Sequence, residues 1–130
     1  MYTLPENFNY ELLSGCYLEM ISFGASITRL DFARPQLSPG RPAYRVAFGI
    51  EGPLRYRIHN KLGSREFSDT SSCSPLIELL LHDVTEVAKI GAASLTIKFG
   101  DIGMVEVDGE LDTEFESYSI YLNSGEIVVV

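Results

Sequence analysis

Apolar and polar residues alternate along most of this chain, and a period of two is typical of β-strands with one buried face. Residues 44–50 alternate in this way, as do residues 54–59 and 94–99. Further strands are expected at 17–24, 26–33, 84–90, 103–108, 115–122 and 126–130. Glycine-containing turns separate these segments, so the sequence predicts a domain of the α+β class that is mainly β and built from antiparallel meanders.

Three parts of the chain depart from the alternation. Pro75 precedes a leucine-rich run, and proline suits the first position of a helix, so we expect one short helix at 75–82. The first fourteen residues fit a short helix or a strand about equally well. Residues 34–42 hold three prolines, and residues 60–74 are polar and serine-rich, so both are expected to be loops.

The length of 130 residues predicts a single domain over 1–130. An apolar content of 45% with seven Tyr and seven Phe excludes intrinsic disorder. The apolar runs are too short for a membrane span, and nothing near the N-terminus resembles a signal peptide. Two cysteines make no disulfide framework, so we expect the reducing cytoplasm. The expected core comprises Phe32, Phe48, Tyr56, Ile97, Phe99, Tyr118 and Ile120.

A weak repeat relates the two halves of the chain. Sliding the sequence by 67 positions lays residues 17–35 on 84–102, where Phe32 meets Phe99. After a gap change, residues 56–58 lie on 118–120. An internal duplication would make the half-repeats 17–59 and 84–122 two related four-strand meanders with the helix between them. Convergent strand patterning explains the same identities equally well.

The net charge of -8 is unevenly divided. Residues 1–65 carry eight Lys or Arg against five Asp or Glu, a sum of +3, and residues 66–130 carry two against thirteen, a sum of -11. Acidic residues occupy every second position from 106 to 116: Glu106, Asp108, Glu110, Asp112, Glu114 and Glu116. In an extended chain they would lie on one side and face a basic protein partner. A solvated strand edge or a bound hard cation are the other interpretations, and the offsets do not fit an EF-hand.

A basic stripe is expected opposite this acidic row. Residues 51–53 are predicted to join 44–50 and 54–59 as a hairpin, with Phe48 opposite Tyr56. Arg45, Arg55, Arg57 and His59 would then share one outer face. They could pair with the acidic half within one chain or across a dimer. The overall negative charge opposes nucleic acid as a partner.

The sequence offers little for catalysis. Its two histidines, His59 and His82, lie in no recognisable triad motif, and no zinc-ligand spacing or phosphate-binding glycine loop occurs. We therefore predict no catalytic residue, no metal and no cofactor. The favoured function is a non-enzymatic binding protein that recognises a protein partner, or its own copy, through the acidic surface. The alternative is a small-ligand binder or an enzyme with a pocket between the two meanders.

Residues 84–130 carry a further pattern of short motifs. Alternating Leu95, Ile97 and Phe99 precede Gly100-Asp101, and Phe115-Glu116-Ser117-Tyr118 leads to a closing aliphatic strand. This region resembles a bacterial family of uncharacterised small domains that looks associated with polymorphic-toxin loci. The resemblance implies an acidic immunity-type protein that binds and blocks a toxin. It assigns no catalytic role to any residue.

Overall fold

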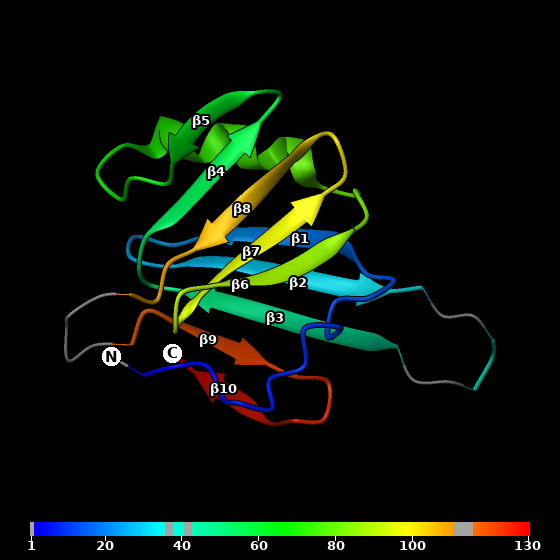
Figure 1. The fold of residues 1–130 in the computed structure, drawn as a ribbon. Helices are drawn as coiled ribbons and strands as arrows, with labels where there is room; N and C mark the ends of the chain where they lie inside the picture. The colour runs from blue at the N-terminus through cyan, green and yellow to red at the C-terminus, as the bar shows by residue number, and fades with distance from the viewer. Residues whose placement is uncertain (1, 36–37, 41–42, 111–115) are drawn as a thin grey trace.

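Two five-stranded antiparallel sheets face each other in the computed structural model, which describes residues 2–35, 38–40, 43–110 and 116–130 (Figure 1). Sheet A has the order β1-β2-β3-β9-β10 and sheet B the order β5-β4-β8-β7-β6. The strands of sheet A are β1 (Tyr17–Phe23), β2 (Thr28–Arg34), β3 (Tyr44–Ile50), β9 (Tyr118–Tyr121) and β10 (Ile127–Val129). Those of sheet B are β4 (Leu54–Ile58), β5 (Lys61–Ser64), β6 (Glu86–Ile90), β7 (Ser94–Phe99) and β8 (Gly103–Val107). The predicted mainly β, antiparallel fold class is confirmed.

The core lies between the sheets and contains every side chain expected there. Phe32, Phe48, Tyr56, Ile97, Phe99, Tyr118 and Ile120 are all buried. The Phe32 ring lies 5.8 Å from the ring of Phe48 in its own sheet and 6.3 Å from that of Phe99 in the other sheet. Burial of these rings is the main stabilising contribution, because a buried aromatic side chain removes a large apolar area from water.

The two halves of the chain follow the same strand order. Strands β1, β2 and β3 form a meander in sheet A, and the β4–β5 hairpin lies in sheet B. Strands β6, β7 and β8 form the matching meander in sheet B, and the β9–β10 hairpin lies in sheet A. The counterparts of β1 to β5 are β6 to β10, in that order. When each strand of sheet A is replaced by its counterpart, the strand order becomes that of sheet B read in reverse. This exchange of hairpins is compatible with the predicted duplication, although each half is a meander of three strands plus a hairpin rather than a four-strand meander.

The strand register defines which residues are equivalent. Leu30 and Ile97 are equivalent in the sequence repeat, and their neighbours across the sheet are Phe48 and Val105. Phe48 is therefore equivalent to Val105. Two residues further along these strands, Ile50 is equivalent to Val107. Ile50 lies opposite Tyr118, and Val107 lies opposite Leu54. Tyr118 thus corresponds to Leu54, two residues away from the match expected from sequence.

The predicted hairpin of β3 and β4 is wrong. Phe48 lies opposite Ile120, and Tyr56 lies opposite Val105 in the other sheet. The intervening residues carry the chain from sheet A to sheet B. Before the crossing, the backbone N–H groups of Glu51 and Gly52 donate to the carbonyl oxygen of Ser117 at 2.9 and 2.8 Å. That anchor holds the end of β3 beside the start of β9.

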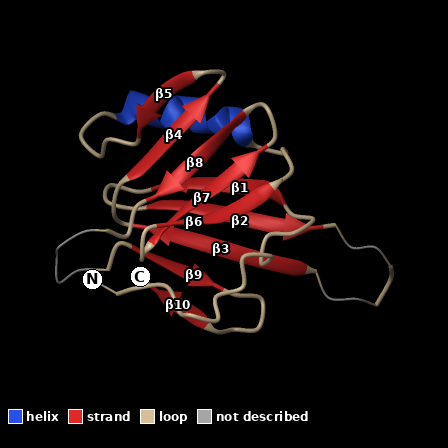
Figure 2. Cartoon of the chain, viewed as in Figure 1, coloured by secondary structure: helices blue, strands red, loops and turns tan. Residues whose placement is uncertain are grey.

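The one short helix is confirmed in place between the halves, but its type and bounds differ from the prediction (Figure 2). It is a 3₁₀ helix, η1 (Thr70–Leu79), and it begins where the Asp69 side chain accepts a hydrogen bond from the backbone N–H of Ser71. Pro75 lies inside it rather than at its first position. Strand β5 also occupies part of the segment expected to be a loop. Residues 2–14 form turns rather than a helix or strand, with Leu12 and Leu13 buried.

Candidate functional site: the outer faces of the two sheets

Arg55 neutralises the first part of the acidic row on the outer face of sheet B. Its Nη2 donates to Glu106 Oε1 and to Asp108 Oδ2, each at 2.8 Å. The hydrogen bonds to Glu106 and then Asp108 raise the pKa of the Arg55 guanidinium. The acidic and basic halves therefore pair within one chain at this position, as one of the sequence interpretations expected.

Beyond Glu106 the acidic row leaves strand β8, which ends at Val107. Burial raises the pKa of the Asp108 carboxyl, but hydrogen bonds from Arg55, the Glu110 backbone and Ser94 more than offset it, so the pKa lies below its ordinary value. Glu110 Oε1 accepts a hydrogen bond from the Ala93 backbone N–H at 2.7 Å. Glu116 is exposed, and Asp112 and Glu114 lie outside the described residues. Glu106, Asp108 and Glu110 thus serve as hydrogen-bond acceptors for the protein itself.

The expected basic stripe does not exist as one surface, and that prediction is corrected. Arg55 and Arg57 point outward from β4 in sheet B, whereas Arg45 points outward from β3 in sheet A. The reason is the crossing between sheets, which separates the two strands. Arg57 lines a shallow apolar hollow with Met104 and with Leu62, whose surface is 84% exposed.

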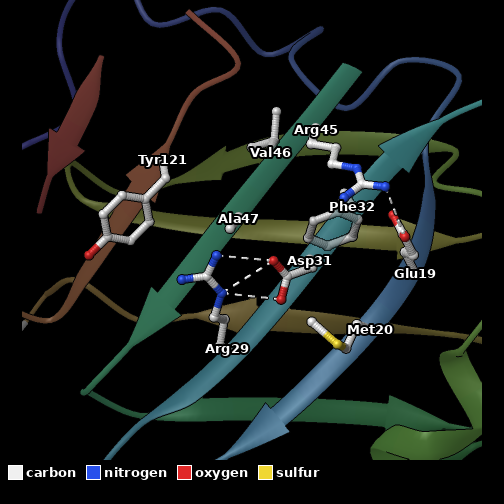
Figure 3. Close-up of a pocket in the computed structure, with 9 residues that line it drawn as sticks. All are labelled: Glu19, Met20, Arg29, Asp31, Phe32, Arg45, Val46, Ala47 and Tyr121. Carbon is white, nitrogen blue, oxygen red and sulfur yellow. Dashed lines mark hydrogen bonds and ion pairs between the residues drawn. The ribbon is translucent and has the colours of Figure 1, made fainter. Parts of the chain in front are cut away.

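The outer face of sheet A contains a hollow of about 300 Å³ that sequence reasoning missed (Figure 3). Its floor includes Ala47, and the neighbouring outward position on β3 is Gly49. Because the outward residues of the central strand β3 are small here, the surface is depressed in the middle of the face. Met20, which is 52% exposed, and Tyr121, which is 41% exposed, rise on either side. The sequence does contain one indication of this hollow, because Ala47 and Gly49 are small residues at alternate positions of a predicted strand.

Two ion pairs fix the arginines around this hollow. Arg29 Nε lies 3.2 Å from both carboxylate oxygens of Asp31, and its Nη2 lies 3.2 Å from Oδ1. The Arg29 guanidinium carbon also lies 5.7 Å from the centre of the Tyr121 ring. On the other side, Arg45 Nη2 lies 3.5 Å from Glu19 Oε1. Figure 3 shows the first pair next to Ala47 and the second next to Phe32, and their four charges cancel.

The space between the sheets is filled by the core side chains, and the larger hollows open at the outer surface and at the ends of the sheets. His59 Nε2 lies 3.3 Å from Glu78 Oε2 on the exposed surface. Cys16 and Cys73 are free thiols. Within the described ranges, no three His, Cys, Asp or Glu side chains gather in a way that could hold a metal ion.

Comparison with known proteins gives no relative: no family model, curated protein or solved structure matches the chain. Among the residues described, no helix has the length and apolar character needed to cross a membrane.

Proposed function

We propose that this chain is a non-enzymatic binding protein that recognises a folded protein partner through the outer face of sheet A. The observation that carries the proposal is the hollow over Ala47, rimmed by Met20, Arg29, Arg45 and Tyr121. Aromatic residues, methionine and arginine are the types enriched in protein interfaces relative to the rest of the surface. A hollow with such a rim suits a protruding apolar side chain of the partner.

Both arginines of the rim have a carboxylate partner within the chain. Asp31 holds Arg29 beside Tyr121, and Glu19 pairs with Arg45. Side chains held in place before binding lose less conformational entropy when the partner arrives. Because the charges on this face sum to zero, it suits a contact surface with an apolar centre and a mixed polar rim.

The acidic half has a separate role in this proposal. Residues 66–130 carry thirteen acidic and two basic residues, which would attract a basic partner over a distance and raise its rate of encounter. The immunity-type role implied by the C-terminal resemblance is one form of this function, with a toxin as the partner. In either form, Glu116 is a described acid exposed for such steering.

The test compares Tyr121→Ala with Arg57→Ala, because these residues are equivalent in the two sheets. Partner proteins are captured from extracts of the source cell by immobilised protein, identified by mass spectrometry and purified for affinity measurement. We expect Tyr121→Ala to weaken binding at least about tenfold, as for an aromatic residue central to an interface. Arg57→Ala should leave binding unchanged. Equal losses in both variants, or a loss confined to Arg57→Ala, would contradict the proposal.

A further inference from the structure

A second hollow lies at the end of sheet A, between the N-terminal segment and the turn that joins β9 to β10. Figure 1 shows the N-terminal segment beside β10. The hollow has a volume of about 450 Å³, within the range of about 300–1,000 Å³ typical of small-molecule sites. It is separate from the hollow over Ala47 and shares no lining residue with it. Its size and position make it a candidate ligand site in its own right.

Two of the three asparagines that line this hollow, one in the N-terminal segment and one in the turn between β9 and β10, accept hydrogen bonds from the backbone. Asn9 Oδ1 accepts a hydrogen bond from the backbone N–H of Glu11 at 3.0 Å, and Asn123 Oδ1 accepts one from Arg45 at 3.1 Å. With the oxygen of each amide engaged, each Nδ2 keeps two N–H donors. Over the described part of the chain, neither Nδ2 group has a hydrogen-bond acceptor. Two separate segments that line the hollow therefore carry amide donors with no acceptor among the described residues.

The walls add aromatic surface and a carboxylate. Phe8 and Tyr44 both line the hollow and are half-buried against the core. The Tyr44 hydroxyl donates to the carbonyl oxygen of Leu12 at 2.6 Å, and the Arg34 guanidinium lies 4.0 Å from the centre of its ring, so the ring is held on two sides. The exposed Glu126 contributes carboxylate oxygens that can only accept when ionised.

We infer that this hollow binds a neutral, hydroxyl-rich small molecule, such as a single sugar residue. A hydroxyl group both donates and accepts, so it can bond to an Asn Nδ2 group and to the Glu126 carboxylate at once. The C–H face of a sugar ring can pack on Phe8 or Tyr44. The lining holds Glu126 and no Lys or Arg, so it disfavours phosphates and carboxylates.

The experiment uses saturation-transfer NMR with the full chain and glucose, galactose, mannose and N-acetylglucosamine, each offered separately. At least one sugar should receive saturation and should shift the side-chain amide signals of Asn9 and Asn123. Asn123→Ala should weaken binding about tenfold, the effect of losing one hydrogen bond of average strength. No transfer to any of the four sugars would overturn the inference.

Two further variants keep the test decisive if Asn123→Ala disturbs the backbone of β3. Glu126→Gln changes only an exposed carboxylate and should weaken sugar binding severalfold. Glu116→Gln makes the same change at an exposed acid outside the hollow and should leave sugar binding unaltered. Equal binding by all variants, or saturation of a short peptide but of no sugar, would overturn the inference. Either result leaves the proposal for the outer face of sheet A intact, since Tyr121 plays no part in this hollow.

Discussion

Sheets A and B share one strand order but present different outer faces. Outward positions that are equivalent in the two sheets hold Gly49 and Glu106, Ser119 and Arg55, and Tyr121 and Arg57. In sheet B, Arg55 bonds to two carboxylates, and a hollow of about 240 Å³ lies beside Arg57, Leu62 and Met104. In sheet A, small side chains leave a hollow beneath exposed aromatic and sulfur-containing groups. Charged groups are paired within the chain on both faces, and our proposal assigns partner binding to the face with the hollow over Ala47.

The largest expected effect concerns the glycines of the two sheets. In sheet B, a Cβ on Gly103 would collide with the backbone carbonyl of Arg57 on the neighbouring strand, and backbone cannot move aside cheaply. Gly103→Ala should therefore lower the free energy of unfolding by about 3 kcal/mol. In sheet A, a Cβ on Gly49 would lie 3.4 Å from the Tyr121 ring, an ordinary contact. Gly49→Ala should stay within about 1 kcal/mol of the native protein.

Urea denaturation followed by circular dichroism measures both glycine variants under the same conditions. A Gly103→Ala protein as stable as the native one would show that β4 and β8 do not approach as closely as described.

The next effect concerns the ion pairs of sheet B. Arg55→Ala leaves Glu106 and Asp108 close together without a cation, and the loss should be about 1 kcal/mol because the arginine is half exposed. Ser119→Ala at the equivalent position of sheet A should change stability by less than about 0.5 kcal/mol. Thermal unfolding of the two variants gives the comparison, and equal losses would argue against a special role for Arg55.

The acid dependence of stability should come partly from the same cluster. The folded-state pKa of Asp108 is lowered, so its contribution is present above the ordinary aspartate pKa of about 3.9 and is lost as the pH falls through the lowered pKa. Arg55→Ala removes hydrogen bonds that keep this pKa low, and its stability should fall less steeply between about pH 4 and pH 2. Urea midpoints measured across this range check the slope. Parallel curves for the two proteins would refute the assignment.

A small and similar effect on stability is expected for the two variants used in the binding test. Tyr121 and Arg57 are both outward and partly exposed, so Tyr121→Ala and Arg57→Ala should each cost no more than about 0.5–1 kcal/mol. A melting temperature close to that of the native protein in both variants separates loss of binding from loss of folding. A much larger loss in Tyr121→Ala would mean that its ring supports sheet A itself.

Local patterns in the sequence were enough to locate most strands and the core, but they did not identify strand partners. Alternation along 94–99 marks β7 because the side-chain period is a property of the strand alone. The partner of β3 depends instead on whether residues 51–53 return the chain to the same sheet or carry it to the other one. The contact made there is with the Ser117 carbonyl, which is distant in the sequence. Strand β5 was missed because its Lys-Leu-Gly-Ser sequence has a single large apolar residue, and Leu62 points outward.

The candidate site was harder to predict for the same reason. The acidic row was visible, but its pairing with Arg55 depends on β4 lying beside β8. The hollow of sheet A is made by the small side chains of β3 together with Tyr121 of β9, which are more than 70 residues apart in the chain. The sequence points to Arg45, but Arg29 and Tyr121, which line the same hollow, cannot be chosen without the order of the strands.

The most direct test of the binding face uses two methionines, Met20 on the outer side of sheet A and Met104 on the outer side of sheet B. Their methyl groups are labelled with carbon-13, assigned with Met20→Leu and Met104→Leu, and followed by NMR as the purified partner is added. We expect the Met20 signal to shift or broaden on binding while the Met104 signal stays in place. A shift of Met104 with Met20 unmoved would contradict the assignment of the binding face to sheet A.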